Sequence, residues 1–416
     1  MARVMVMSPP GPDNFMRNGR CDFVSWSGCQ WWPIILGYLA QYLRAKGHEI
    51  TFIDAQAWGK TRREILEHLR EVRYDFIVMM INSSNISEDM LFAGAIGILN
   101  RVILVGPATT LHATLLEQHG FDFVMGEPEH GVQYIIEGIV KGKVRGIPLT
   151  QSEFSQIPAV SRLFSTFDAQ HYVAPSEPHP FVDIMTARGC AYGKCSFCVW
   201  PKTYARHYTP RNIGEVLSEL KFIQDYGKFK SVMIQDDTLP EERAIELSEA
   251  IILNNHLFRL PWSCYVRADI TKKTLELMKR ARCLNIHVGY ESGNDETLER
   301  THKGITTSQM KTFTKNAKSA GLNIHGDFMI GIDRTLAEIR KTVNFACALR
   351  PHTAQFQVYI PFLGEKPSLQ REELEKLARK AYRKFYGNPM SWPAIAQQIG
   401  KPRVFKQAME AVCKTS

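Results

Sequence analysis

The sequence predicts an α/β protein: a doubly wound domain, then a partial parallel barrel of (β/α)6 type, then a helical C-terminal region. Two observations predict this order. Short apolar runs alternate with amphipathic helical stretches in two separate parts of the chain, and 416 residues exceed one ordinary domain. The composition, 44% hydrophobic and 22% charged, is typical of a globular chain and argues against disorder or a membrane bundle.

The first domain is predicted over residues 1–145, where a helix-like segment follows each of five apolar runs. These runs are Val4 to Met7, Ile50 to Asp54, Phe76 to Ile81, Val102 to Gly106 and Asp122 to Met125. Such alternation is typical of a parallel sheet covered by helices, whose ligands lie beyond the carboxyl ends of the strands. We therefore expect one site, lined by the loops Ser8 to Asp13, Asn82 to Ser87, Gly106 to Thr110 and Gly126 to Glu129.

Residues 146–178 are rich in proline and lose the periodicity, which predicts a linker. A second alternation over 179–365 predicts the barrel, and residues 366–416 are expected to be helical and basic. Its strand-like runs are Phe181 to Thr186, Ser231 to Asp236, Trp262 to Arg267, Leu284 to Tyr290, Leu322 to Ile330 and Ala354 to Ile360. Barrels of this kind place their chemistry on the loops that follow the strands.

The strongest chemical signal is a loop with three thiols directly after the first strand of the barrel. Cys190, Cys195 and Cys198 lie within nine residues. Three thiolates can hold three corners of a cubane iron-sulfur cluster and leave the fourth iron open to a substrate or cofactor. The alternative is a zinc site with His207 as the fourth ligand. The remaining six of nine cysteines are mostly isolated, which predicts free thiols rather than a disulfide framework.

Further motifs accompany this loop in both halves of the chain. The second half contains Arg188 to Cys198, Val199-Trp200-Pro201, Asp236-Asp237-Thr238, Arg267-Ala268-Asp269, Gly289 to Gly293, Lys303-Gly304-Ile305 and Met329-Ile330-Gly331. The first half contains Pro9-Pro10, Gly37-Tyr38-Leu39, Gly47 to Asp54, Val105-Gly106-Pro107 and Gly126 to Glu129. Over most of its length the chain thus resembles radical S-adenosylmethionine (SAM) enzymes with an N-terminal cobalamin-binding domain. Residues 198–208 are similar to the hopanoid-biosynthesis branch.

The resemblance implies a Rossmann-like, cobalamin-binding-type first domain and a radical SAM barrel. It implies a 4Fe-4S cluster on Cys190, Cys195 and Cys198, which binds SAM at its open iron and cleaves it to a 5′-deoxyadenosyl radical. The implied SAM-binding residues are Phe197, Asp236, Arg267, Glu291, Ser292 and Gly331. The implied cobalamin-binding residues are Pro10, Ser83, Gly106, Pro107, Thr109, Gly126 and Glu127.

The chain departs from the family pattern in two places. Four residues separate Cys190 from Cys195 where the family usually has three, and Gly193 can absorb the extra residue in a tight turn. The first domain has no Asp-x-His-x-x-Gly stretch to supply a lower axial histidine, and Ala108 stands where related sequences often have His. We therefore expect cobalamin to bind without a protein histidine below it.

The resemblance implies cobalamin-dependent transfer of a methyl group to an unactivated carbon of a small or lipid-like substrate. It also implies an external electron donor of flavodoxin or ferredoxin type. The alternative is a radical rearrangement, cyclisation or carbon-bond formation without methyl transfer. A methylthiotransferase acting on transfer RNA is disfavoured, because Cys21 and Cys29 lack a third cysteine in the first domain. A non-catalytic metal-binding or nucleic-acid-binding module is the third class that we consider.

Several weaker signals remain open. Trp26, Trp31 and Trp32 fit an aromatic platform or plain packing, and His287 fits a core histidine. Residues that would line the barrel or pack in its core are Trp262, Tyr265, Gln355, Gln357 and Tyr359. No secretory pattern is visible before Pro9, so we expect a cytoplasmic protein. The net charge is +9, of which +7 falls in residues 366–416, where 11 Lys and Arg face 4 Glu. This local excess argues against binding of a polyanion over the catalytic domains. It predicts a solvated helix face, with contact to an acidic substrate, a membrane surface or a partner as the alternative.

Overall fold

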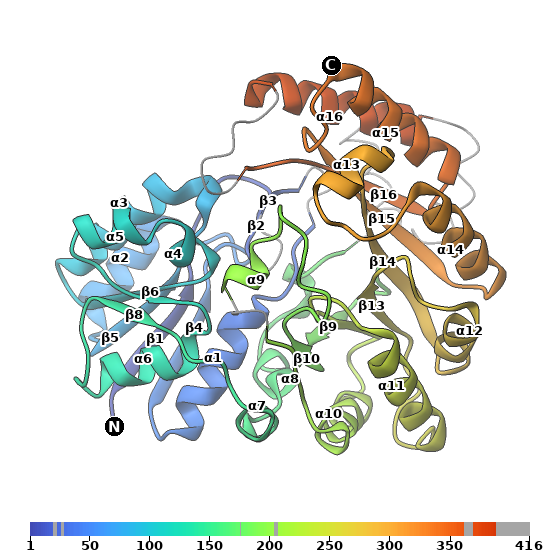
Figure 1. The fold of residues 1–416 in the computed structure, drawn as a ribbon. Coiled ribbons are helices and arrows are strands. Elements are labelled where there is room, and N and C mark those ends of the chain that lie inside the picture. Colours follow the sequence, from blue (N-terminus) through green and yellow to red (C-terminus); the bar gives the residue numbers. More distant parts are fainter. Residues whose placement is uncertain (20–22, 26–28, 175, 204–206, 362–368, 388–416) are drawn as a thin grey trace. The chain divides into compact units, whose positions relative to one another are not determined.

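The computed structural model describes residues 1–19, 23–25, 29–174, 176–203, 207–361 and 369–387 (Figure 1). The chain divides into two compact units. The first comprises Met1–Ala174, Val182–Cys190 and Val199–Phe222. The second comprises Pro175–Phe181, Ala191–Cys198 and the residues from Ile223 onward. The described residues form two six-stranded sheets.

The first unit confirms the doubly wound fold. Its sheet has the strand order β4-β1-β5-β6-β7-β8, and all neighbouring strands are parallel. The strands are β1 (Arg3–Ser8), β4 (Glu49–Asp54), β5 (Phe76–Met80), β6 (Arg101–Val105), β7 (Asp122–Met125) and β8 (Lys143–Arg145). The five strands predicted from the sequence are all present, and β8 is an additional one. Its three residues are too few to give a periodic signal.

Helices cover this sheet, which explains why β5 is a continuous apolar run with every residue buried. They are α1 (Ile34–Ala45), α2 (Arg62–Glu71), α3 (Ile86–Gly97), α4 (Pro107–Leu111), α5 (Ala113–Gln118) and α6 (Pro128–Ile136). The start of α2 follows from its sequence. Thr61 accepts a bond from the backbone of Glu64, and the Glu64 side chain accepts one from the backbone of Thr61, which is a capping box.

The segment predicted as a linker contains two short helices, α7 (Gln151–Gln156) and α8 (Val160–Phe164), and the 3-10 turn η2 (Ala169–His171). They belong to the first unit. Trp32 stacks on Phe164 and on Tyr172, with ring centroids 4.6 and 3.6 Å apart. Trp32 therefore packs in the core. The first unit also holds β2 (Phe15–Met16), β3 (Phe23–Val24), η1 (Ser83–Asn85), β10 (Ala187–Arg188), α9 (Trp200–Thr203) and β11 (Thr209–Pro210).

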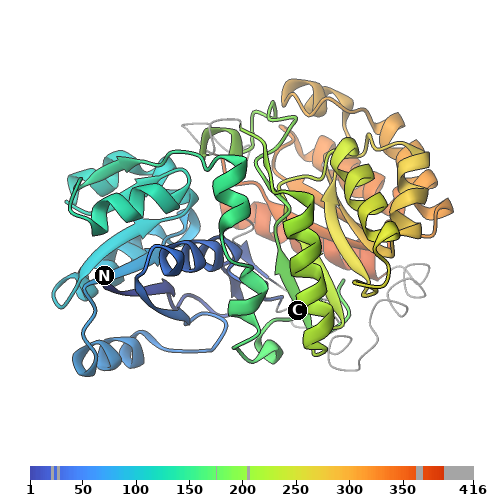
Figure 2. The same cartoon turned by 90° about the horizontal axis from the view of Figure 1, so that it is seen from below.

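The second sheet confirms the partial parallel barrel, with the strand order β16-β15-β14-β13-β12-β9. The strands are β9 (Phe181–Ile184), β12 (Ser231–Ile234), β13 (Trp262–Val266), β14 (Cys283–Glu291), β15 (Asn323–Ile330) and β16 (Thr353–Val358). All six predicted strands are present, and the pairs from β12 to β16 are parallel. The helices between them are α10 (Ile213–Tyr226), α11 (Glu241–Leu253), α12 (Lys272–Arg280), α13 (Asp295–Arg300), α14 (Thr307–Ser319) and α15 (Leu336–Leu349). Those from α11 onward lie together on one side of their strands (Figure 2).

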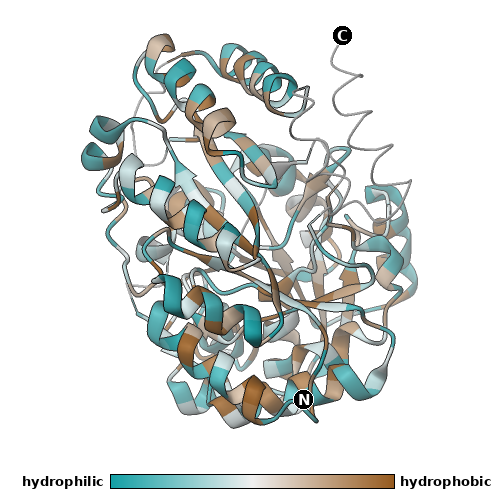
Figure 3. Ribbon diagram, turned by 90° about the vertical axis from the view of Figure 1, so that its right-hand side faces the viewer, coloured by the Kyte–Doolittle hydropathy of each residue, from teal (hydrophilic) through white to brown (hydrophobic). Residues whose placement is uncertain are grey.

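The two faces of the barrel sheet have opposite character. On the helix-covered face the rings of Tyr290, Phe328 and Phe356 stack in a row, with centroids 5.5 and 5.6 Å apart. Along β15, buried and partly exposed residues alternate strictly. The partly exposed set includes His325 and Asp327, so the other face, the barrel interior, is polar. Figure 3 shows both hydrophilic and hydrophobic residues along the helices, as is typical of helices with one buried face.

The basic C-terminal region begins with α16 (Arg371–Tyr386), as predicted. Its apolar face is buried at Leu374, Ala378, Ala381 and Phe385. The Tyr386 hydroxyl donates to the carbonyl of Ala354 on β16 at 2.7 Å. This helix is therefore part of the barrel unit, and its basic residues lie on the opposite, exposed side. The predictions for residues 388–416 lie outside the described residues.

In the described part of the chain, no helix has the length and apolar character needed to span a bilayer.

Candidate functional site

The three cysteines of the predicted cluster site follow β10 on one loop. All three are of intermediate exposure and form no disulfide, whereas Cys264 and Cys283 are buried. Burial raises the pKa of the Cys264 thiol well above its usual value, which disfavours the thiolate that binds metal. Gly193 has a φ of 55°, a left-handed conformation that suits glycine, so the extra residue between Cys190 and Cys195 is accommodated as predicted.

Tyr192 and Ser196 fix this loop to the segment after α13. The Tyr192 hydroxyl donates to the carbonyl of His302 at 2.8 Å, and the Ser196 amide donates to the carbonyl of Thr301 at 3.0 Å. Gly304 has a φ of 71°, and a Cβ atom at this position would collide with the Tyr192 ring. The glycine is therefore needed both for its backbone conformation and for the space that Tyr192 fills.

Arg267, a predicted SAM-binding residue, lies over the same tyrosine. Its guanidinium carbon is 3.8 Å from the centroid of the Tyr192 ring. It also donates to the carbonyl of Lys303 at 3.0 Å and pairs with Asp269 at 2.8 Å. Arg267 thus links the end of β13 to the cysteine loop, and part of its side chain already serves to hold that loop in place.

Glu291, another predicted SAM-binding residue, forms a buried ion pair with Lys303, with 2.9 Å between Oε1 and Nζ. Glu291 has a φ of 65°, at a bulge in the pairing of β14 with β15. Such strain in a non-glycine residue is frequent at functional sites. Burial alone would lower the pKa of Lys303, but the charges of Glu291 and then Cys195 more than offset it and raise the pKa. The ammonium group therefore remains charged beside a proposed cluster ligand, and its Nζ lies 5.8 Å from the Phe197 ring.

The other predicted SAM-binding residues lie at strand ends, as expected. Asp236 is fully buried after β12. The Ser292 hydroxyl donates to Asp333 at 2.7 Å, so this side chain is engaged within the protein. Gly331 has a φ of 100°, and a Cβ atom there would press on Leu374 of α16. Because Gly331 has no side chain and the Ser292 hydroxyl is engaged, both residues could contact SAM only through their backbone.

The loops predicted to bind cobalamin meet at the carboxyl edge of the first sheet, because all its strands are parallel. Ser83 is half-buried, and His112 Nε2 lies 3.1 Å from its hydroxyl. Thr109 is fully buried, and its hydroxyl donates to the carbonyl of Gly106 at 2.7 Å. The hydroxyl of Thr110 accepts a bond from the amide of Gly126 at 3.1 Å. Pro10 is buried and Pro107 begins α4.

Glu127 has a structural partner that the sequence did not reveal. Its Oε2 accepts from Arg188 at 3.2 Å, and Glu129 accepts from the same guanidinium at 2.7 Å. All three side chains are at most 2% exposed. Burial raises the pKa of Glu127, while the charge of Arg188 opposes it. Arg188, two residues before Cys190, is thereby anchored, and the predicted cobalamin contact at Glu127 competes with this ion pair.

Some of the residues that were expected to line the barrel or pack in its core lie on its interior face. Tyr265 and Gln355 lie on the interior face, since their register partners are His287 and Asp327. Trp262 is on the other face: it is fully buried and donates to the carbonyl of Ala281 at 2.7 Å. Successive residues of a strand point to opposite faces, so Trp262 faces the core whereas Ser263 faces the barrel interior.

Two buried groups in this interior have strongly shifted pKa values. Burial lowers the pKa of His287 to about 3, and the neighbouring His325 acts in the same direction, so the imidazole is neutral at neutral pH. Burial raises the pKa of Glu177 to about 8, against the hydrogen bond that Ser263 donates at 2.8 Å. His287 is thus a buried histidine, as predicted, but Glu177 and His325 were missed. In the sequence, His325 is only a polar residue within a predicted strand, and Glu177 is only an acidic residue within the predicted linker.

The donor set fits the implied cofactors at the barrel. Three partly exposed thiols suit three irons of a cubane, and none of the described cysteines forms a disulfide. At the first sheet, the positive φ of Gly106 and Gly126 gives backbone that a large ligand can approach closely. Of the alternatives, His207 is exposed, Cys29 is buried, and Cys21 and Trp26 lie outside the described residues.

Comparison with known proteins identifies both domains. Residues 24–136 match the family model described as B12 binding domain, and residues 184–346 match that of the radical SAM superfamily. An uncharacterized methyltransferase of Pyrococcus horikoshii is 26% identical, covering 86% of this chain and 88% of its own. The anaerobic magnesium-protoporphyrin IX monomethyl ester cyclase of Cereibacter sphaeroides is 22% identical, covering 80% and 59%. Bacteriochlorophyllide d C-12(1)-methyltransferase of Chlorobaculum tepidum is 23% identical, covering 77% and 70%.

A solved structure shows the same fold. The cobalamin-dependent S-adenosylmethionine radical enzyme OxsB, with aqua-cobalamin and S-adenosylmethionine bound, superposes with a TM-score of 0.65 at 17% identity. The match covers 93% of this chain, which spans only 56% of the OxsB chain.

Fold, cysteine loop and family matches define the class: this chain is a radical SAM enzyme. More particularly, it belongs to the radical SAM enzymes that carry an N-terminal B12-binding domain. This class uses a 4Fe-4S cluster, SAM and cobalamin. The match therefore decides against the zinc site and the non-catalytic module.

Proposed function

We propose that the chain transfers a methyl group to an unactivated carbon of a small-molecule or lipid-like substrate, with cobalamin and radical SAM chemistry. The observation that carries this proposal is the presence of both cofactor domains in one chain. The Pyrococcus relative, named as a methyltransferase, aligns with nearly the whole of it, and the Chlorobaculum relative is a named methyltransferase too.

We further propose a division of labour along the chain. Residues 1–145 hold cobalamin, residues 179–365 hold the cluster and SAM, and 146–178 connect the two. Cys190, Cys195 and Cys198 are the proposed cluster ligands. Phe197, Asp236, Arg267, Glu291, Ser292 and Gly331 are the proposed SAM contacts, and Pro10, Ser83, Gly106, Pro107, Thr109, Gly126 and Glu127 are the proposed cobalamin contacts.

When bound, the cluster supplies the electron that cleaves SAM, and cobalamin supplies the methyl group. The chain supplies orientation and exclusion of water. Tyr192 and Arg267 hold the cysteine loop against the strand ends. The buried Lys303–Glu291 pair places a fixed positive charge next to Cys195 and an acceptor carboxylate close by. These side chains are therefore already in position before a ligand binds, which lowers the entropic cost of ordering the reactive site.

The partners follow from this chemistry. The cluster needs an external one-electron donor, and we propose one of flavodoxin or ferredoxin type. We propose a reducing compartment, the cytoplasm, because none of the seven described cysteines forms a disulfide.

The test is a product analysis that does not require the substrate. The cluster-loaded protein is incubated with hydroxocobalamin, a strong reductant and SAM carrying a trideuterated methyl group. We expect S-adenosylhomocysteine to form and the label to be recovered with the corrinoid by mass spectrometry. Omission of cobalamin is the control and should abolish S-adenosylhomocysteine. If only 5′-deoxyadenosine forms with cobalamin bound, methyl transfer is wrong.

A second candidate is radical rearrangement, cyclisation or carbon-bond formation without methyl transfer. The relative from Cereibacter sphaeroides, named as a cyclase, favours it. This candidate predicts 5′-deoxyadenosine as the product from SAM and no transfer of the methyl label, so the same experiment separates the two.

A further inference from the structure

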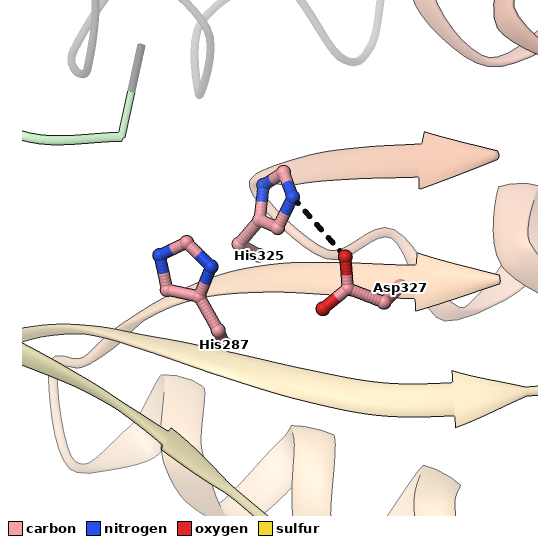
Figure 4. A group of neighbouring side chains, drawn as sticks. All are labelled: His287, His325 and Asp327. Carbon is pink, nitrogen blue, oxygen red and sulfur yellow. Dashed lines mark ion pairs between the residues drawn. The ribbon is translucent and has the colours of Figure 1, made fainter. Parts of the chain in front are cut away.

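The interior of the barrel contains two histidines and an aspartate on adjacent strands. The strand register pairs Tyr265 with His287, His287 with His325, and His325 with Thr353. These four residues form one layer across β13, β14, β15 and β16. Asp327 lies two residues after His325, so it is on the same face in the next layer. Figure 4 shows the side chains of His287, His325 and Asp327 converging on one point.

A hydrogen-bonding group fixes each imidazole from behind. His325 Nδ1 is 2.7 Å from the hydroxyl of Thr353, and its Nε2 is 3.5 Å from Asp327 Oδ1. His287 Nε2 is 3.3 Å from the hydroxyl of Ser176 and 3.7 Å from Glu177 Oε1. Its other nitrogen turns toward His325 and Asp327 (Figure 4). Both rings therefore present one nitrogen to a common point and hold the other against an outer partner.

This pattern is the one that metal-binding histidines show. A ligating imidazole almost always donates its other N–H to a carboxylate, hydroxyl or carbonyl, which fixes the ring and its tautomer. Here Ser176 and Glu177 lie next to Nε2 of His287. Thr353 lies next to Nδ1 of His325. The Oε1 atom of the buried Glu177 has no hydrogen-bond partner among the described residues.

The distances suit a single ion after a small adjustment. One ligand atom from each of the three residues lies within 4.8 Å of the other two. At metal–ligand distances of about 2.0–2.2 Å, the ligand atoms of one tetrahedral ion are about 3.4 Å apart, so each side chain moves by less than about 1 Å. His325 and Asp327 are 16% and 24% exposed, which leaves the interior side of the site open.

We propose that His287, His325 and Asp327 bind one divalent first-row transition-metal ion, of the Zn²⁺ or Fe²⁺ kind, inside the barrel. Two imidazoles and one carboxylate are a ligand set that suits these ions, and three protein ligands leave positions open for water or a substrate oxygen. The site is separate from the three cysteines in ligand type, since it uses nitrogen and oxygen only. The inference does not rest on methyl transfer and stands whichever radical reaction the enzyme performs.

The test is zinc binding to the full chain with its iron-sulfur cluster in place, so that the cysteines are occupied. The protein is treated with a chelator, equilibrated with Zn²⁺ by dialysis, and analysed for zinc separately from iron and cobalt. We expect about one Zn²⁺ per chain for the wild type. Asp327→Asn and His325→Ala should each weaken Zn²⁺ binding by at least about tenfold, and Thr353→Val, behind His325, by about tenfold as well.

His256→Ala is the matched control, because His256 is an exposed histidine outside the site, and it should bind zinc as the wild type does. Bound Zn²⁺ should also raise the thermal unfolding temperature of the wild type but not that of Asp327→Asn, whose nearly identical shape preserves the fold. If the wild type retains less than about a tenth of an equivalent, or if Asp327→Asn binds as tightly as the wild type, the proposal is wrong.

Discussion

The carboxyl edge of the first sheet and the interior of the second use their polar side chains differently. At the first, Glu127 and Thr109 are bonded to other groups of the same unit, and Arg17 forms a buried ion pair with Asp89 at 2.8 Å. In the second, His325 and Asp327 are partly open, and Glu177 keeps a buried oxygen without a hydrogen bond. Polar residues at one place thus hold the scaffold together, while at the other His325 and Asp327 are partly exposed to a ligand.

Changes at the ligand-binding residues of the barrel, including the cysteine loop, should affect ligands and spare the fold. Cys195→Ala should lose the iron-sulfur cluster, because the two remaining thiolates leave two of the four irons without a protein ligand. Formation of 5′-deoxyadenosine should then fall by more than about 100-fold. The unfolding temperature of the metal-free protein should change little. The measurement is iron content together with product analysis after anaerobic reconstitution. Cys347→Ala, another half-exposed free thiol, is the control and should keep both.

Changes at the first region should instead affect stability. Arg188→Met leaves Glu127 and Glu129 buried without their partner and should lower the free energy of unfolding by about 3–5 kcal/mol. Denaturant unfolding measures this loss. Arg63→Met, which removes an exposed pair with Glu67, should cost about 0.3–0.5 kcal/mol. Equal losses for the two variants would show that the buried cluster does not hold the scaffold.

Asp54 in the first unit should make the free energy of unfolding depend on pH. Burial raises the pKa of Asp54 from 3.8 to about 6, against hydrogen bonds from Ala57 and Tyr172. The folded protein then holds this proton longer than the unfolded chain. Its contribution to stability is full below about pH 4 and is lost as the pH rises through 6, about 3 kcal/mol in total.

Asp54→Asn should therefore gain about 1.4 kcal/mol relative to the wild type between pH 5 and pH 8. Urea unfolding of both proteins at the two pH values measures this gain. A constant difference between them would mean that Asp54 titrates normally in the folded protein.

The smallest expected effect separates backbone strain from positioning of the cysteine loop. Gly304→Ala and Gly321→Ala both place alanine at a positive φ, 71° and 78°, and this backbone conformation alone should cost each about 1–2 kcal/mol. Only at Gly304 does the new methyl group meet Tyr192, whereas at Gly321 the nearest atom is in the Lys279 side chain at 3.5 Å.

We therefore expect Gly304→Ala alone to alter the spectrum of the reduced cluster. Electron paramagnetic resonance of both reconstituted variants is the measurement. The same spectrum in both would contradict a role for Tyr192 in holding the loop.

Much of the fold could be predicted, because long apolar runs such as Phe76–Met80 and alternating ones such as Asn323–Ile330 have clear periodicity. The missed elements are short. Strand β8 has three residues, and α7 and α8 have six and five, so each offers too little pattern to recognise between prolines. Their stability comes from tertiary packing, as with Phe154 and Phe164, which are fully buried.

The cysteine loop was also predictable, since its spacing is local in sequence. The bonding of Glu127 to Arg188, 61 residues away, was not, and neither was the convergence of His287 with His325. A strand end predicts where a side chain lies but not which distant partner it meets. Tyr192, Arg267 and Lys303 illustrate this: their contacts with one another depend on three separate segments.

The most direct test of the account is the electron paramagnetic resonance of the reduced, reconstituted wild type with and without SAM. We expect about four irons and four sulfides per chain and a cluster signal that shifts when SAM is added, because one iron is open to it. A colourless protein without iron and sulfide, or a cluster signal that SAM leaves unchanged, would contradict this expectation.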